Sequence, residues 1–163
     1  MNKVIVIGCP GSGKSTFSRA LASKTGLPLY HLDMMYWNAD RTTVSKETFQ
    51  ARLDEVLARD AWIVDGNYAG TMERRLQACD TVFFLDYPTD VCLAGLAARR
   101  GKARPDLPWV ERADETDEEF IRFVTDYATE SRPRVLELLA QYADRTVVVF
   151  GSRDEAREYL EKL

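Results

Sequence analysis

The sequence lacks the features that mark secreted, zinc-binding or membrane proteins. Its three cysteines, Cys9, Cys79 and Cys92, are far apart and contain no Cys-x-x-Cys pair, which argues against a disulfide framework or a zinc site. Its apolar runs, such as residues 4–7 near the N-terminus, fall well short of the roughly 20 residues that a membrane-spanning helix needs. We therefore expect neither a signal peptide nor a membrane span, and a reducing, cytoplasmic location.

An excess of positive charge is also missing. The net charge is −4, and the isoelectric point is about 5.1, which disfavours direct binding to nucleic acid. The exception is a short basic segment that contains no acidic residue and that suits one small anionic ligand; it comprises Arg99, Arg100, Lys102 and Arg104.

The length and the apolar pattern predict one α/β domain over residues 1–163. Short apolar runs typical of buried strands occupy residues 4–7, 29–32, 62–64, 82–85 and 147–150. Amphipathic helices are expected between them, at residues 14–25, 45–59 and 70–79. Strands that alternate with helices in this way predict a parallel sheet covered on both faces.

Later residues indicate where the remaining helices begin. Thr116 and Ser152 each precede a glutamate with capping-box spacing, so helices should start just after them. Pro133 should kink or restart the long helical stretch that follows residue 117. Residues 101–113, with two prolines and no periodicity, are expected to form a long mobile loop.

The strongest functional signal is a phosphate-loop motif, GxxxxGK[ST], at residues 8–15, between the first strand and the first helix. Its glycines let backbone N–H groups face phosphate oxygens at the positive end of the following helix. Lys14 should bridge the outer phosphates, and Ser15 should ligate Mg²⁺. The alternative is a glycine turn that only joins strand to helix. The expected nucleotide-binding residues are Gly8, Pro10, Gly11, Ser12, Gly13, Lys14, Ser15 and Thr16.

Rival classes of phosphate-loop protein are disfavoured by further absences. The chain has no NKxD guanine motif and no DxxG element after its third strand, which argues against a switch GTPase. Large mechanical ATPases usually need a longer chain and an arginine finger from a neighbour. A compact kinase is therefore the favoured interpretation.

The sequence resembles the adenylate kinase and shikimate kinase group in three segments. They are GCPGSGKST, HLD ending at Asp33, and VDGNY at residues 64–68. The sequence is also similar to the family of DNA topology modulation (FlaR-like) proteins. This similarity lies in the longer segments HLDMMYW, VDGNY, ERRLQACDTVFFLDYP and RRGKARPD. The resemblance implies a three-layer αβα phosphate-loop fold with strand order 2-3-1-4-5. It also implies a lid at about residues 101–113 and an acceptor-side segment at about residues 30–60.

As function, the resemblance implies a Mg·ATP-dependent transfer of the γ-phosphate to a small acceptor, by a monomer or homodimer. The family name suggests a second hypothesis, a nucleotide-dependent regulator of DNA topology or transcription. A plain ATPase is the third.

The resemblance also assigns the acidic and aromatic site residues. Asp33 would hold the acceptor hydroxyl, and Trp37 and Tyr68 would line the acceptor pocket, although Trp37 could instead belong to the core. Asp65 would orient Mg²⁺ through water; the alternatives are a turn aspartate at this position and Asp86 as the metal residue. His31 is more simply a hydrogen-bonded strand residue than a catalyst.

Arginines complete the expected site. Arg99, Arg100, Arg104 and Arg132 would neutralise charge on the transferred phosphoryl group, and Arg153 would lie near adenine. Arg99 and Arg100 could instead be solvated residues at a helix end. The arginine that grips a monophosphate in adenylate kinases is missing; Arg75, or else Arg74, could replace it, and one of this pair must face solvent because adjacent helical residues diverge by about 100°.

Overall fold

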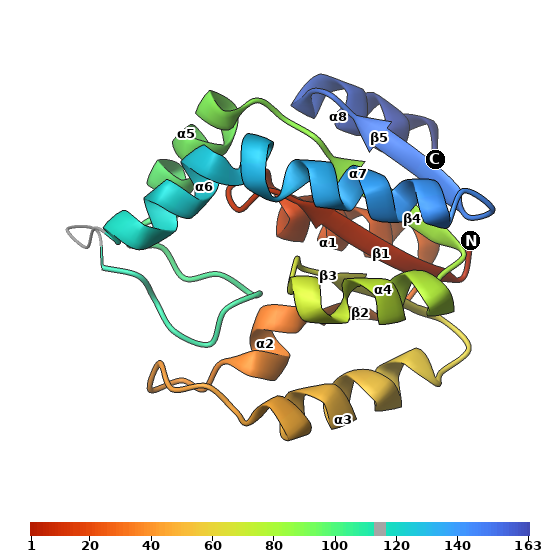
Figure 1. Ribbon diagram of the computed structural model, residues 1–163, viewed down its shortest axis with the longest axis horizontal. Helices are drawn as coiled ribbons and strands as arrows, with labels where there is room; N and C mark the ends of the chain where they lie inside the picture. The colour runs from red at the N-terminus through yellow and green to blue at the C-terminus, as the bar shows by residue number, and fades with distance from the viewer. Residues whose placement is uncertain (113–116) are drawn as a thin grey trace.

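The computed structural model describes residues 1–112 and 117–163. Its sheet is five-stranded and parallel, in the order β2-β3-β1-β4-β5 (Figure 1), which confirms the expected fold and strand order. The strands are β1 (Lys3–Gly8), β2 (Leu29–His31), β3 (Trp62–Asp65), β4 (Thr81–Leu85) and β5 (Thr146–Phe150). Because all strands run in the same direction, their carboxyl ends share one edge of the sheet, where open α/β sheets bind ligands.

The helices agree closely with the periodicity, with one addition. They are α1 (Lys14–Thr25), α2 (Leu32–Tyr36), α3 (Lys46–Leu57), α4 (Ala69–Ala78), α5 (Thr89–Arg99), α6 (Glu118–Glu130), α7 (Arg132–Gln141) and α8 (Arg153–Lys162). The sequence did not predict α2, and Leu32 begins this helix where a strand residue was expected. The strand ends at His31 because its partner β3 ends opposite, at Asp65.

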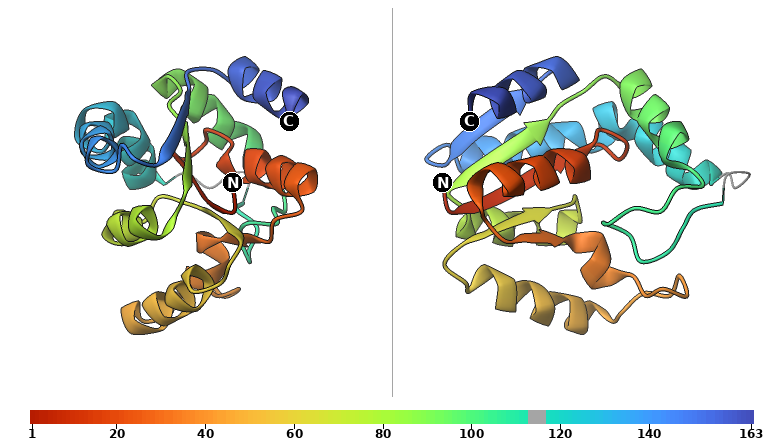
Figure 2. Two further views of the ribbon diagram at one scale, coloured as in Figure 1. Left: turned by 90° about the vertical axis from the view of Figure 1, so that its right-hand side faces the viewer. Right: turned by 180° about the vertical axis from the view of Figure 1, so that it is seen from behind.

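Helices cover both faces of the sheet, as the left panel of Figure 2 shows. Alternate residues of β1 point to opposite faces. Ile5 and Ile7 pack in a core with α3, α4 and α7, whereas Val4 and Val6 pack in a second core with α1, α5, α6 and α8. Burial on both faces explains why the strands appear in the sequence as continuous apolar runs.

Local sequence features determine where the later helices begin. The Ser152 hydroxyl accepts a hydrogen bond from the Glu155 backbone N–H at 3.2 Å, so α8 starts as predicted. Pro133 lies in the first turn of a separate helix, α7, which confirms the predicted restart. The N-cap of α6 is Asp117, which accepts from the Phe120 N–H at 3.0 Å, and Thr116 lies outside the described residues.

The segment 101–112 connects α5 toward α6 without regular secondary structure. Figure 1 and the right panel of Figure 2 both show it extending from α5 toward α2, across the carboxyl edge of the sheet. Position 113 of the expected lid lies outside the described residues. Among the helices of residues 1–112 and 117–163, none combines the length and the apolarity needed to cross a membrane.

Candidate active site

The phosphate loop links β1 to α1 and is packed tightly against α5. Gly11 has φ 85° and Gly13 has φ 96°, a region that favours glycine. A Cβ atom at Gly11 would lie 2.0 Å from the Cys92 carbonyl oxygen of α5. The close approach of α5 therefore requires glycine at this position of the loop.

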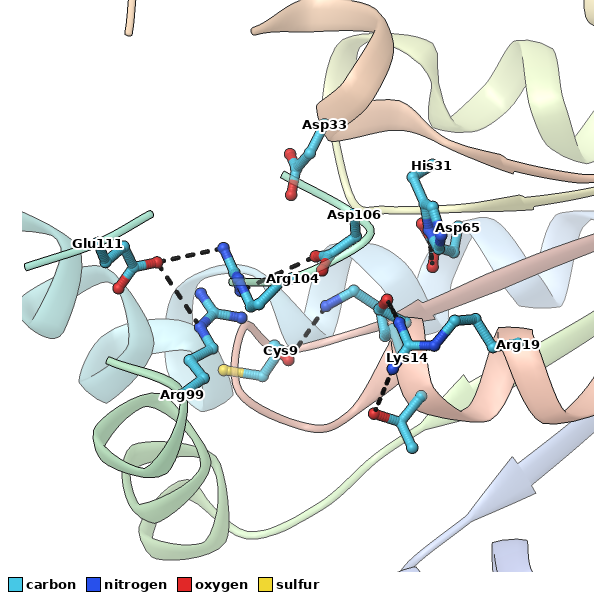
Figure 3. Close-up of polar contacts among 12 residues, drawn as sticks. Cys9, Lys14, Arg19, His31, Asp33, Asp65, Arg99, Arg104, Asp106 and Glu111 are labelled. Carbon is cyan, nitrogen blue, oxygen red and sulfur yellow. Dashed lines mark hydrogen bonds and ion pairs between the residues drawn. The ribbon is translucent and has the colours of Figure 1, made fainter. Parts of the chain in front are cut away.

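Lys14 folds back over the loop. Its Nζ donates to the Gly8 carbonyl at 2.9 Å and to the Cys9 carbonyl at 3.3 Å (Figure 3). Burial lowers the pKa of Lys14, while the nearby Asp65 opposes this shift. The first turn of α1 contains no acidic residue, and Gly13 supplies no side-chain cap, so the positive end of this helix is open to an anion.

Ser15 and Arg19 form a contact that the sequence did not single out. Arg19 donates from Nη1 to the Ser15 hydroxyl, one helical turn earlier, and both residues line the cleft. The i, i+4 spacing on α1 was the only available signal for this pair. A guanidinium next to the expected Mg²⁺ ligand adds positive charge where the outer phosphates would lie.

Asp65 and His31 meet at the ends of β3 and β2, where they are register partners. The His31 Nδ1 lies 2.9 Å from Asp65 Oδ2. Burial lowers the pKa of His31, but the hydrogen bond and the charge of Asp65 outweigh it, and the net shift is upward. His31 is thus the hydrogen-bonded strand residue that was predicted, and it orients the aspartate expected to serve Mg²⁺.

Asp33 lies in the first turn of α2 and is paired with Tyr68. The Tyr68 hydroxyl donates a hydrogen bond to Asp33 Oδ1. Burial raises the pKa of Asp33, while the Tyr68 hydrogen bond and the charge of Lys14 oppose the shift. Tyr68 itself has φ 35°, an uncommon left-handed conformation for a non-glycine residue, and caps α4. Two sequence-distant residues are thereby joined at the predicted acceptor side.

Two expected lid arginines lie beside two acidic residues that the sequence did not identify. Glu111 Oε1 lies 3.2 Å from Arg104 Nη2 and 3.9 Å from Arg99 Nε. Asp106 Oδ2 lies 3.8 Å from Arg104 Nη1. Figure 3 shows this arginine group to the left of Lys14, with Asp106 between Arg104 and Asp65 in the view and Asp33 above Asp106. Burial lowers the pKa of Arg99, and the charge of Arg104 acts in the same direction.

Arg75 is a correction to the predicted acceptor site. Its side chain is fully buried and donates to the carbonyl oxygens of Gly66, Asn67 and Tyr68 and to Thr71 Oγ1. Burial lowers its pKa to about 10. These bonds hold the turn between β3 and α4, and Arg75 is not among the described residues that line the cleft. Arg74 is the solvent-facing member of the pair and contacts Asp54 at 3.1 Å.

Arg132 and Arg100 also lie away from the main cleft. Arg132 donates to the Asp86 carboxylate from Nε, at 2.9 Å to Oδ1 and 3.1 Å to Oδ2, and from Nη2, at 2.8 Å to Oδ2. These contacts raise the pKa of Arg132. Neither Arg132 nor Asp86 is among the described residues that line the cleft. The phosphoryl contact expected of Arg132 and the metal role considered for Asp86 therefore stay predictions. Arg100 borders only a smaller neighbouring cavity.

Arg153, at the start of α8, is hydrogen-bonded to the phosphate loop. Its Nη1 donates to the Ser12 carbonyl at 2.9 Å and its Nη2 to the Gly11 carbonyl at 3.1 Å. Its guanidinium lies over the Tyr87 ring, 5.6 Å from the centroid. This arrangement fixes the loop, and a contact of Arg153 with adenine stays a prediction.

One cleft of about 1280 Å³ brings together most of the expected site. The phosphate loop, Asp33 and Asp65 all border it, and so do Trp37 and Tyr68, the two aromatic residues expected on the acceptor side. The cationic members of its lining are Lys14, Arg19, Arg99, Lys102, Arg104 and Arg153. The geometry thus places the phosphate-loop residues and the acidic and aromatic groups in a single cleft at the carboxyl edge of the sheet.

Comparison with known proteins shows the fold. No family model matches the sequence, and no curated protein matches it. Two shikimate kinases are structurally similar, each at 20% identity. The one from Acinetobacter baumannii, in complex with shikimate, has a TM-score of 0.66 over 99% of this chain and 90% of its own. The one from Bacteroides thetaiotaomicron has a TM-score of 0.59 over 98% and 94%. The chain therefore has the three-layer αβα fold of phosphate-loop kinases.

Proposed function

We propose that the protein is a Mg²⁺-dependent kinase that transfers the γ-phosphate of ATP to the hydroxyl group of a small acceptor. The observation that carries this proposal is the shared cleft, in which Lys14 and Asp33 stand on opposite sides of the space above the phosphate loop. A phosphate bound at Lys14 would face a hydroxyl held at Asp33. The likeness to shikimate kinases supports this arrangement by fold.

The residues fit ATP and Mg²⁺. The open positive end of α1 suits phosphate oxygens. No cluster of three metal-binding side chains occurs in the described part of the chain, which agrees with Mg²⁺, because this ion usually keeps several waters and binds one or two carboxylates plus phosphates. When bound, Mg²⁺ would offset the negative charge of the phosphate oxygens. We propose Ser15 and Asp65 as the protein groups nearest to it.

The transfer needs a group that accepts the acceptor's proton. The acceptor oxygen would form a bond to the γ-phosphorus, the bond from that phosphorus to the β–γ bridging oxygen would break, and ADP would leave. Asp33 would take the hydroxyl proton, and its raised pKa makes it a better proton acceptor than an ordinary carboxylate. Arg99 and Arg104, across the cleft, would stabilise charge on the moving phosphoryl group.

The ion pairs of the basic segment favour the kinase over the DNA-regulator hypothesis. Arg104 is only 14% exposed and, like Arg99, faces Glu111. These two cations therefore line a cleft rather than a surface broad enough for a nucleic acid. We retain the resemblance to DNA topology modulation proteins as a proposal about ancestry, not about direct DNA contact.

Acceptor-stimulated ADP formation tests the proposal. The wild-type protein with Mg·ATP would be screened against nucleosides, nucleotides, sugars and small hydroxy acids. Lys14→Ala serves as the control, because it removes the phosphate contact on the loop. At least one acceptor class should raise ADP formation in the wild type and not in the variant. Stimulation by DNA alone, with none of the small molecules active, would contradict the proposal.

A further inference from the structure

Two cysteine thiols meet behind the phosphate loop. Cys9 is the second residue of the loop, and Cys92 lies in α5. Both are free thiols with exposed fractions of 3% and 0%, buried in the core that α1, α5, α6 and α8 share. The Cys9 thiol is hydrogen-bonded to the sulfur of Cys92. The proposed kinase mechanism uses neither thiol, so this pair needs a separate explanation.

Backbone contacts hold the two cysteines next to each other. A Cβ atom at Gly11 would lie 2.0 Å from the Cys92 carbonyl oxygen, and a Cβ atom at Gly95 would lie 2.0 Å from the Gly11 carbonyl oxygen. The loop and α5 therefore touch backbone to backbone, just after Cys9 and at Cys92 itself. Because the main chains are fixed in this way, the two side chains stay neighbours without any covalent bond between them.

The pair also lies close to the wall of the main cleft. Pro10 and Val91, the chain neighbours of Cys9 and Cys92, both line this cleft. A small oxidant that enters the cleft is thus one residue away from each thiol. Hydrogen peroxide is an oxidant of suitable size, because it is little larger than water.

The two thiols differ in acidity. The hydrogen bond from Cys9 lowers the pKa of Cys92 and raises that of Cys9. Burial opposes the shift of the Cys92 pKa, whereas the positive charges of Lys14 and Arg153 strengthen it. The thiolate is the form that peroxides oxidise. We therefore expect Cys92 to react first and Cys9, next to it, to complete a disulfide.

Cys79, the third cysteine, provides a comparison within the same chain. It is buried to nearly the same degree, with 4% exposed, but it belongs to the core on the other face of the sheet. Its Sγ lies 3.5 Å from the Leu76 carbonyl oxygen, and burial raises its pKa to about 11. Within the described part of the chain Cys79 has no thiol partner, so we expect it to be inert.

A bond between the two sulfurs would change the support of Lys14. The Cys9 carbonyl accepts a hydrogen bond from Lys14 Nζ at 3.3 Å, and Figure 3 shows the Cys9 sulfur pointing away from Lys14. Gly11 already touches α5, so the loop has no room to move as a whole toward Cys92. The sulfurs must approach when they bond, and Cys9 itself must therefore turn. This turn would displace the Cys9 carbonyl from Lys14.

We propose that Cys9 and Cys92 form a reversible disulfide that lowers the affinity of the phosphate loop for nucleotides. The oxidant is a hydroperoxide. The Cys92 thiolate attacks one peroxide oxygen, the O–O bond breaks, Cys92 becomes a sulfenic acid, and the leaving hydroxide takes up the thiol proton as water. The Cys9 sulfur then attacks the Cys92 sulfur, the S–O bond breaks, and a second water leaves. Two thiols and one hydrogen peroxide thus give one disulfide and two waters.

The first part of the test locates the disulfide. The wild type, Cys92→Ala and Cys79→Ala would be treated with hydrogen peroxide, blocked with iodoacetamide, digested with trypsin and analysed by mass spectrometry. Cys9 falls in peptide 4–14, and Cys92 falls in peptide 76–99. Because peptide 76–99 also contains Cys79, the Cys79→Ala variant makes the assignment unambiguous and is the matched control. Thermal melts would confirm that each variant is folded.

The second part measures Mg·ADP affinity by calorimetry, on protein that has not been blocked. Each protein would be titrated before oxidation, after oxidation, and after treatment with dithiothreitol, which reduces the disulfide and is itself oxidised to one. The affinity of the wild type and of Cys79→Ala should fall about tenfold on oxidation, the effect of one lost hydrogen bond to a charged group, and dithiothreitol should restore it. Oxidation should leave the affinity of Cys92→Ala unchanged.

The wild type and Cys79→Ala should both contain peptide 4–14 linked to peptide 76–99, lighter by two hydrogen atoms than the separate thiols. These two proteins decide the disulfide even if Cys92→Ala does not fold. No link in Cys79→Ala, a link through Cys79, sulfinic acid in place of the disulfide, or an unchanged Mg·ADP affinity of the linked protein would overturn the inference. Absence of Mg·ADP binding by the reduced protein would overturn the nucleotide effect together with the kinase proposal, while the peptide map still decides the disulfide.

Discussion

Replacing Asp33 by asparagine should separate catalysis from binding and from stability. The substitution keeps the size of the side chain and an oxygen that can accept from Tyr68, but it removes the carboxylate that we propose takes the acceptor's proton. Phosphoryl transfer should fall by about 10²- to 10⁴-fold, the range typical of a lost general base. Affinity for Mg·ATP should change little, because Asp33 lies on the proposed acceptor side of the cleft.

Stability gives an independent check on the same variant. Burial raises the pKa of Asp33 in the folded protein, so the ionised carboxylate destabilises the folded state at neutral pH relative to a neutral side chain. The melting temperature of Asp33→Asn should therefore equal or exceed that of the wild type. A large loss of activity together with a lower melting temperature would indicate a structural role instead.

The pH dependence of the transfer rate tests whether Asp33 accepts the proton, because Tyr68 affects the pKa of Asp33. Because Asp33 must be ionised to accept a proton, the rate should rise with pH through its pKa, above the ordinary aspartate value of about 3.9. The Tyr68 hydrogen bond opposes the upward shift, so Tyr68→Phe should move this acid limb to higher pH. Single-turnover transfer measured across pH for the wild type, Tyr68→Phe and Asp33→Asn distinguishes these cases. An acid limb at the same pH in Tyr68→Phe would contradict the assignment of this limb to Asp33.

Further predictions concern the residues around this site. Arg75→Met should lower the free energy of unfolding by about 3–5 kcal/mol in urea titrations, because the carbonyls of the β3–α4 turn lose buried donors; a change below about 1 kcal/mol would contradict the assigned role. Because the pKa of His31 is raised, its pairing with Asp65 stabilises the fold at pH values below the ordinary histidine pKa. This stabilisation is lost as the pH rises through the raised pKa of His31. The difference in unfolding free energy between the wild type and His31→Gln should thus be larger at about pH 6 than at about pH 9, and a pH-independent difference would count against the pair. Proteolysis within residues 101–112 should slow when a Mg·ATP analogue and an acceptor are both bound, as expected for a lid; cleavage indifferent to ligands would count against one.

The sequence predicted the fold well because its strongest signals are local. The phosphate loop at residues 8–15, the apolar strands and the cap at Ser152 each depend on residues that are neighbours in the chain. The strand order came from the family resemblance, since periodicity alone does not determine which strands are adjacent. The short helix α2 was missed because its start depends on where β2 loses its partner in the sheet.

The site was predicted less completely because burial and long-range pairing decide its composition. Adjacent helix positions required that one of Arg74 and Arg75 face solvent, but only the packing of α4 shows that Arg75 is the buried one. Glu111 lies in a loop without periodicity, so nothing in the sequence linked it to Arg99 and Arg104. Arg132 was placed at the phosphoryl group, although Asp86 was available as its partner.

The most direct test of the kinase assignment follows the label of γ-³²P-ATP once an acceptor has been found in the screen. We expect one labelled acceptor molecule for each ADP formed by the wild type, and neither product above background from Lys14→Ala. Label that appears only as inorganic phosphate, at the same rate with and without acceptor, would identify an ATPase and contradict the kinase assignment.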